Sequence, residues 1–140
     1  MPILDTDTLT IIQRREEPYY TRLLVRLRSL PANTTVWSTI VSFEEQLRGW
    51  LEYIKRASPA QLPAAYEKLN ELHQDFNSRP VLMFSHAAAD VFSTLKGKIH
   101  VNARDLKIAS LAIANGELLL SRNLRDFRRV PGVRAEDWTI

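Results

Sequence analysis

Residues 104–121, RDLKIASLAIANGELLLS, contain the pattern that decides the fold class. Apolar side chains recur at helical spacing from Arg104 to Asn115, and Gly116 is the residue type that commonly ends a helix. The apolar run from Leu118 to Ser121 has the length and character of a buried strand. A helix that leads into a buried strand is the repeating unit of an α/β protein with a parallel sheet.

The same alternation extends towards the N-terminus. Strands are expected at residues 2–4, 36–41 and 80–84, with a short extended piece at 99–101. Helices are expected at about 8–30 in two pieces around Pro18, and at 42–57, 58–77 and 85–95. With 140 residues, no internal repeat and no linker, residues 1–140 are predicted to form a single domain.

The composition limits the possible chemistry. The chain has no cysteine, so a bound metal would need oxygen or imidazole ligands, which points to hard cations. No apolar stretch approaches the roughly 18 residues of a membrane span, and the N-terminus lacks a basic stretch followed by an apolar run. We therefore expect a soluble, cytoplasmic protein with no membrane association.

The basic residues are mostly arginine, which supplies fourteen of the nineteen, and the net charge is +3. Five arginines lie within residues 122–134. The arginine side chain suits phosphate because its planar fork binds two oxygens at once. A polyanionic partner, either a nucleic acid or an acidic protein, is one interpretation, and a solvated charged face is the other.

Four acidic residues follow the predicted strands. Asp5 comes directly after the first strand, Glu45 lies in the first turn after the second, Asp105 opens the helix after residues 99–101, and Asp126 follows the last strand. In open parallel sheets, ligands bind outside the carboxyl ends of the strands. These four carboxylates are therefore expected to share one edge of the sheet.

Asp105 has a physical argument of its own. It shares a helical face with Ile108, Ala109 and Ala112, so its carboxylate is expected to project towards the core. A buried carboxylate must be hydrogen-bonded, paired with a cation or bound to a metal. The alternative is a capping role, since an acid in the first helical turn is favoured by the helix dipole.

The other three acids have competing interpretations. Asp5 stands at a strand end without an evident local donor, which favours a metal role, whereas Asp7 is expected to cap the following helix. Glu45 is the third residue after Ser42, so the two form a possible capping box, and helical spacing does not decide between Glu44 and Glu45. Asp126 has the alternative of a surface acid paired with an arginine.

Four phrases, in order along nearly the whole chain, resemble the PIN-domain ribonucleases, particularly the VapC-type toxins of toxin–antitoxin pairs. The phrases are Leu4–Asp7, Glu44–Trp50, Asp105–Ala109 and Ser121–Phe127, the last leading into Val130-Pro131-Gly132. The resemblance implies a three-layer α/β/α PIN-like fold, in which helices flank a mostly parallel central sheet.

The resemblance also implies a site. Asp5, Glu45, Asp105 and Asp126 would bind the metal, and Glu45 is selected over Glu44 because the family's glutamate stands four residues before the glycine, here Gly49. Ser121 and Asn123 would have supporting polar roles. The chain departs from the family at two positions, with Ser85 where many relatives carry an acid and Ser121 where threonine is common.

The function that the resemblance implies is a Mg²⁺- or Mn²⁺-dependent endoribonuclease, with RNA as substrate, a cognate antitoxin as partner and a homodimer as assembly. One alternative is a catalytically silent PIN-like binding module, against which the intact acidic quartet argues. The other is a receiver-like Mg²⁺-binding domain, which would need an acceptor aspartate ending a central strand. The middle strand ends instead in Thr39-Ile40-Val41-Ser42.

Overall fold

Five short parallel strands form the centre of the structure, a computed structural model that describes residues 1–140. The strands are β1 (Ile3–Leu4), β2 (Ser38–Thr39), β3 (Val81–Leu82), β4 (Leu119–Leu120) and β5 (Ala135–Glu136). They form two ladders, β1–β4–β5 and β2–β3, which a parallel bridge between Ile3 and Trp37 connects. The resulting order is β3–β2–β1–β4–β5. It differs from the 2-1-3-4-5 order of receiver domains, so the receiver-like alternative is wrong.

The two faces of the sheet pack against separate clusters of apolar side chains. Ile3 and its partner Leu119 belong to one cluster, which includes residues of the helix that precedes β4. Leu4 and its partner Leu120 belong to the other, which includes Leu9 of the helix that follows β1. Because neighbouring residues of a strand point to opposite faces, helices cover both sides of the sheet. The predicted three-layer α/β/α architecture is confirmed.

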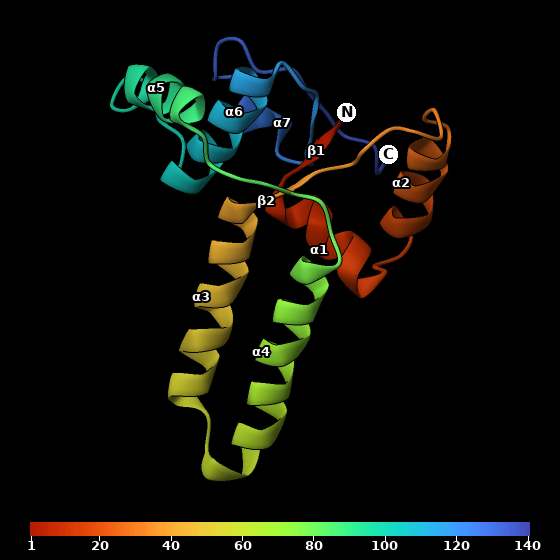
Figure 1. Cartoon of the computed structure of the whole chain (residues 1–140), viewed down its shortest axis with the longest axis vertical. Coiled ribbons are helices and arrows are strands. Elements are labelled where there is room, and N and C mark those ends of the chain that lie inside the picture. Colours follow the sequence, from red (N-terminus) through yellow and green to blue (C-terminus); the bar gives the residue numbers. More distant parts are fainter.

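Seven α-helices surround the sheet (Figure 1). They are α1 (Thr6–Arg14), α2 (Tyr19–Arg28), α3 (Ile40–Arg56), α4 (Leu62–Asn77), α5 (His86–Leu95), α6 (Ala103–Asn115) and α7 (Leu124–Phe127), and a short 3-10 helix, η1 (Pro59–Gln61), precedes α4. Helices α3 and α4 run side by side as a hairpin that extends away from the sheet (Figure 1). No helix is both long and apolar enough to cross a membrane.

The start of α3 differs from the prediction. The helix begins at Ile40 rather than Ser42, because the Thr39 hydroxyl accepts a hydrogen bond from the Ser42 backbone N–H and so caps the helix three residues before the expected cap, Ser42. The β-branched residues Ile40 and Val41 are typical of strands, but here they pack against the core from the first turn of a helix. Tertiary burial outweighs their local preference.

Two further segments concern the limits of the sheet. Residues 99–101, expected as a short extended piece, join no strand ladder, and Ile99 and Val101 pack against the core from the connection between α5 and α6. Strand β5 was not predicted, since Ala135–Glu136 lacks an apolar run. It lies at the sheet edge and pairs only with β4, where one partly exposed residue and one exposed residue are tolerated.

Candidate active site

The strand order reverses between β1 and β4. From β1 the chain first adds β2 and β3 on one side, and then returns to place β4 on the other side. Such a reversal is where ligands bind in open α/β sheets, at the carboxyl ends of the strands. Asp5 follows β1 and Ser121 follows β4, so these two side chains meet at the reversal point.

Asp5 is buried, with 5% of its surface exposed, and hydrogen bonds hold both of its carboxylate oxygens. The Ser121 hydroxyl donates to Oδ2 at 2.5 Å, and the Thr8 backbone N–H donates to Oδ1 at 2.8 Å. Burial raises the pKa of Asp5, and these hydrogen bonds oppose the rise. The carboxylate is thereby fixed in one orientation.

The capping roles of Asp5 and Asp7 are the reverse of those predicted. Asp5 is the N-cap of α1 through its bond from Thr8, so the expectation that it lacks a local donor was wrong. Asp7 lies inside the first helical turn with an exposed side chain. The sequence did not reveal this because Asp5 is the single residue between β1 and α1, which leaves no room for a separate cap.

A chain of hydrogen bonds connects Asp5 to Asp126. The Asn123 backbone N–H donates to Ser121 Oγ at 2.9 Å, and Asn123 Nδ2 donates to Asp126 Oδ2 at 2.9 Å. Ser121, which donates to Asp5, therefore shares one network with Asn123 and Asp126. Asp126 is held by an amide rather than by an arginine, so its predicted alternative of a surface ion pair is wrong.

Asp105 lies in the first turn of α6 and is half-buried. Its pKa is raised to about 6, first by burial and then by the negative charges of Asp5, Glu45 and Asp126. Asp105 therefore lies near enough to each of the other three acids to be affected by their charges. The capping alternative for Asp105 is wrong, because the Asn102 side chain accepts from the backbone N–H groups of Arg104 and Asp105 and so caps α6.

Helix α3 presents its two neighbouring glutamates to different surroundings. Glu45 Oε1 lies 3.2 Å from Nη1 of Arg104 on α6, beside Asp105. Glu44 pairs instead with Arg48 one turn along its own helix, at 2.9 Å on an exposed surface. Since the cap of α3 is Thr39, the predicted capping box of Ser42 and Glu45 is also wrong. The ion pairs thus place Glu45, and not Glu44, next to the residue that precedes Asp105, a choice that helical spacing alone did not make.

Small hydroxyl groups join the helices beneath the acids. Thr6 Oγ1 and Ser42 Oγ lie 2.9 Å apart and connect the first turn of α1 to the first turn of α3. Ser42 is fully buried and Thr6 immediately follows Asp5. This contact fixes the position of the helix that carries Glu45 relative to the strand end that carries Asp5.

The donor set has the chemistry of a hard-cation site. Its ligating atoms would be carboxylate oxygens, which Mg²⁺ and Mn²⁺ prefer, and their mutual repulsion is relieved by a cation. No three acidic or histidine side chains are close enough together to form a ready-made metal cage. Glu45 and Asp126 are instead turned towards Arg104 and Asn123. The residues fit a divalent cation in chemistry, and side-chain rotations would be needed to close around one.

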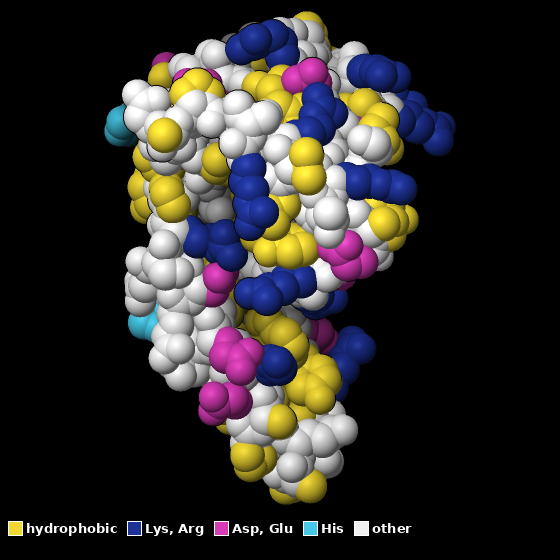
Figure 2. All heavy atoms as spheres, turned by 90° about the vertical axis from the view of Figure 1, so that its right-hand side faces the viewer, with side chains coloured by type: hydrophobic (Ala, Val, Ile, Leu, Met, Phe, Trp, Pro, Cys, Tyr) yellow, Lys and Arg dark blue, Asp and Glu magenta, His cyan; other side chains and the backbone are white.

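One arginine of the 122–134 stretch lies next to the site residue Ser121 in the sequence. The guanidinium of Arg122, next to Ser121, lies 4.1 Å from the centre of the Tyr19 ring and 3.9 Å from Oδ2 of Asp7. Figure 2 shows the face on the α2 side, where Lys and Arg side chains are spread over the upper part. These contacts leave both interpretations of the arginine-rich stretch open, a polyanion surface and a solvated face.

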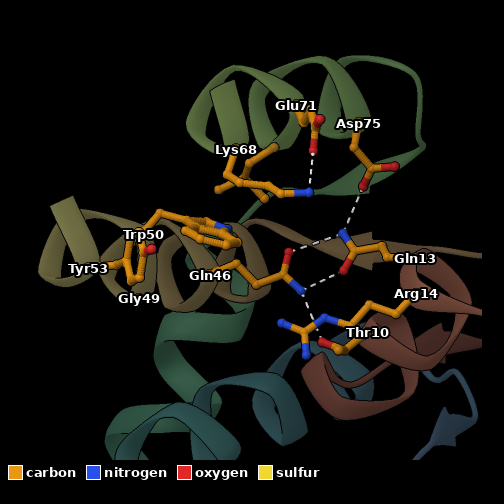
Figure 3. Close-up of a pocket in the computed structure, with 11 residues that line it drawn as sticks. Thr10, Gln13, Arg14, Gln46, Gly49, Trp50, Tyr53, Lys68, Glu71 and Asp75 are labelled. Atoms are coloured by element: carbon orange, nitrogen blue, oxygen red, sulfur yellow. Dashed lines mark hydrogen bonds and ion pairs between the residues drawn. The ribbon is translucent and has the colours of Figure 1, made fainter. Parts of the chain in front are cut away.

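A cavity of about 640 Å³ lies between α1, α3 and α4, and none of the four acids lines it (Figure 3). Gln13 donates to Gln46 at 3.1 Å and to Asp75 at 2.8 Å, which joins the three helices. Burial alone would raise the pKa of Asp75, but hydrogen bonds from Arg79 and Gln13 bring it below its usual range. Sequence reasoning missed this cluster because each member is an ordinary polar residue of an amphipathic helix.

Comparison with known proteins gives a consistent match along the whole chain, although no family model matches it. Ribonuclease VapC2 of Rickettsia felis is 27% identical over 137 residues, which cover 97% of this chain and 96% of the relative.

Solved structures share the fold. VapBC2 from Rickettsia felis bound to a DNA fragment from its promoter gives a TM-score of 0.69 at 24% identity, covering 98% of both chains. VapBC-1 from nontypeable Haemophilus influenzae gives 0.75 at 18% identity, covering 99% of this chain and 98% of the other. FitAcB from Neisseria gonorrhoeae gives 0.68 at 19% identity, with the same coverage.

Proposed function

We propose that this chain is a metal-dependent endoribonuclease and the toxin of a toxin–antitoxin pair. The premise is its resemblance, along its whole length, to the VapC-type PIN-domain ribonucleases. The observation that carries the proposal is the setting of Asp105, whose pKa is raised to about 6 by burial and by the negative charges of Asp5, Glu45 and Asp126. Hydrogen bonds through Ser121 and Asn123 also join Asp5 to Asp126. Repulsion between carboxylates is unfavourable unless a cation relieves it.

The reaction would be hydrolysis of an RNA phosphodiester bond, with Asp5 and Asp105 as the principal ligands of Mg²⁺ or Mn²⁺. When bound, the cation supplies positive charge that polarises the phosphate and activates water. Glu45 and Asp126 would bind a second cation or orient the attacking water. Ser121 would hold the Asp5 carboxylate, and Asn123 would hold that of Asp126, through the hydrogen bonds described above.

The orientation of Asp5 supports its role as a ligand. Each of its oxygens already accepts one hydrogen bond, from Thr8 or Ser121, yet a carboxylate oxygen has a second lone pair. The hydrogen bonds therefore position Asp5 without using its whole capacity to bind a cation. Outer contacts of this kind commonly improve metal affinity by about ten- to a hundredfold.

The proposed partner is a cognate antitoxin, and the proposed assembly is a homodimer. The structural neighbours are toxin–antitoxin complexes, and those from Rickettsia felis and Salmonella typhimurium were solved bound to DNA. The arginine-rich stretch at 122–134 would contact the RNA backbone or an acidic segment of the antitoxin. A neighbouring gene that encodes a short protein with a basic DNA-binding N-terminus and an acidic tail would support the partner, and co-purification of the two proteins would test it.

The catalytic proposal is tested with the purified chain freed of any partner. We expect cleavage of single-stranded RNA with Mg²⁺ or Mn²⁺, loss of cleavage with EDTA, and recovery when excess metal is restored. An Asp5→Asn protein purified in parallel controls for contaminating nucleases. Cleavage that persists in EDTA, or equally in Asp5→Asn and Asp105→Asn, would contradict the mechanism. Partner binding without cleavage would favour the silent binding module instead.

A further inference from the structure

Arg104 is the one basic residue that forms an ion pair with an acid of the site. Its guanidinium Nη1 lies 3.2 Å from Glu45 Oε1, and the pair joins the first turn of α6 to α3. The sequence analysis assigned it no role. Its charge also reaches the adjacent acid, because it lowers the pKa of Asp105 against the opposing effects of burial and the other carboxylates.

The pair is held loosely. The side chains of Arg104 and Glu45 are 48% and 28% exposed, and the guanidinium makes no hydrogen bond that anchors it elsewhere. Arg79 offers a contrast, since it pairs with Asp75 at 22% exposure, and Asp75 is also held by Gln13. Exposed ion pairs contribute little free energy, so the Arg104–Glu45 contact is easily exchanged for a stronger one.

A divalent cation at the four acids would compete with Arg104 for Glu45. Both need the negative charge of the same carboxylate, and the cation carries twice the charge of the guanidinium. When Glu45 turns towards the cation, Arg104 loses its partner while remaining next to the site. The backbone N–H groups of Arg104 and Asp105 already donate to the Asn102 side chain, whereas the guanidinium released from Glu45 would be free to donate to an incoming anion.

We propose that Arg104 is an exchangeable counter-ion of the site: it neutralises Glu45 until a divalent cation binds, and then binds the phosphate of the RNA. The planar guanidinium suits this second role, because it donates two parallel hydrogen bonds to a phosphate. This inference rests on the proposed nuclease function. It adds a residue that couples metal binding to substrate binding.

Calorimetric titration of the whole chain with Mn²⁺ tests the first half of the proposal. The measurement is made at about pH 8, well above the pKa of about 6 of Asp105, so that this group is ionised in every variant. Arg104→Gln is expected to bind Mn²⁺ about two- to fivefold more tightly than wild type, because a competing ion pair is gone. Arg104→Lys should lie close to wild type.

The matched control is Arg48→Gln, which removes the same charge from the exposed pair with Glu44 and should leave Mn²⁺ affinity unchanged. Thermal unfolding of each variant checks folding, since both arginine side chains are substantially exposed. Equal or weaker Mn²⁺ binding in folded Arg104→Gln would overturn the inference.

RNA cleavage at saturating Mn²⁺ tests the second half. Arg104→Gln is expected to raise the KM for RNA about tenfold, as the loss of a charge-assisted hydrogen bond predicts, whereas Arg48→Gln should not. An unchanged KM would overturn the phosphate role. If wild type itself binds no Mn²⁺ and cleaves no RNA, the proposed function fails together with this inference. If wild type does both but Arg104→Gln behaves like it, only the inference fails.

Discussion

The strand-borne half of the site and its helix-borne half are held by different forces. Asp5 and Ser121, at the ends of β1 and β4, are buried and joined by a hydrogen bond. Glu45 and Asp105, on α3 and α6, are partly exposed, and they interact with charged neighbours, Glu45 with Arg104 and Asp105 with the other acids. Hydrogen bonds and burial specify one position, whereas charge permits exchange of one partner for another. The strand half therefore acts as the fixed reference, and the helix half as the adjustable part.

The largest effect is expected from Asp5→Asn, in the fixed half. The amide would place an NH₂ group against Thr8 N–H or Ser121 Oγ–H, which are both donors, and would remove one negative charge. We expect RNA cleavage to fall at least about a hundredfold. Initial rates at saturating Mg²⁺ measure this. Asp90→Asn on the exposed surface of α5 is the control, and a similar loss there would show that the effect is not specific.

Ser121→Ala tests whether the fixed half depends on its hydrogen bond. Without the hydroxyl, Asp5 Oδ2 and the Asn123 N–H lose their partner, so metal affinity should fall about tenfold. Ser110→Ala is the matched control, because Ser110 is an equally buried serine that donates only to the Leu106 carbonyl. It should reduce stability without affecting Mn²⁺ titration. Equal Mn²⁺ affinities in Ser121→Ala and Ser110→Ala would show that the hydrogen bond from Ser121 does not hold Asp5 for metal binding.

Asp105→Asn should stabilise the metal-free protein at neutral pH. A raised pKa means that folding disfavours the ionised carboxylate, so its neutral replacement relieves repulsion from Asp5, Glu45 and Asp126. After solvent screening we expect about 1 kcal/mol, or about 2–4 °C in Tm. Asp75→Asn should do the opposite, because the folded protein lowers the pKa of Asp75. Scanning calorimetry in EDTA compares them, and destabilisation by Asp105→Asn would contradict the charge model.

The smallest effect is the pH dependence of that difference. Between about pH 4 and about pH 6, folded Asp105 retains a proton that the unfolded chain has released. The contribution of Asp105 to the free energy of unfolding therefore falls as pH rises through this range, and it is constant above it. The free-energy gap between Asp105→Asn and wild type should therefore grow from about pH 4 to about pH 6 and then level off. Urea titrations in EDTA measure this free-energy gap. A gap that does not change with pH would exclude this explanation.

The acids were predictable from sequence where position along a strand or helix decides the outcome. The carboxyl ends of parallel strands converge, which placed Asp5 and Asp126 near each other, and helical spacing turned Asp105 inward. The caps were not predictable, because a cap depends on the residue at which the helix starts. Thr39 and Asp5 cap α3 and α1 where Ser42 and Asp7 were expected.

Features that depend on a distant partner escaped the sequence analysis. Arg104 has no pattern of its own, and its role follows from Glu45, which lies on another helix. Strand β5 forms only because β4 offers a free edge, and Leu119 N–H donates to the Arg134 carbonyl. Such contacts arise from tertiary arrangement rather than from local periodicity.

The pairing of β1 with β4 also dictates when the site can form during synthesis. Asp5 is synthesised before its partner Ser121, which lies 116 positions later, and Asp126 follows still further on. Growing chains are extended at about 5–20 residues per second, so the central strand waits seconds for its neighbour. We expect a nascent chain that stops before β4 to lack the pairing of Asp5 with Ser121. The proposed nuclease activity would then be withheld until β4 and the residues that follow it have been synthesised.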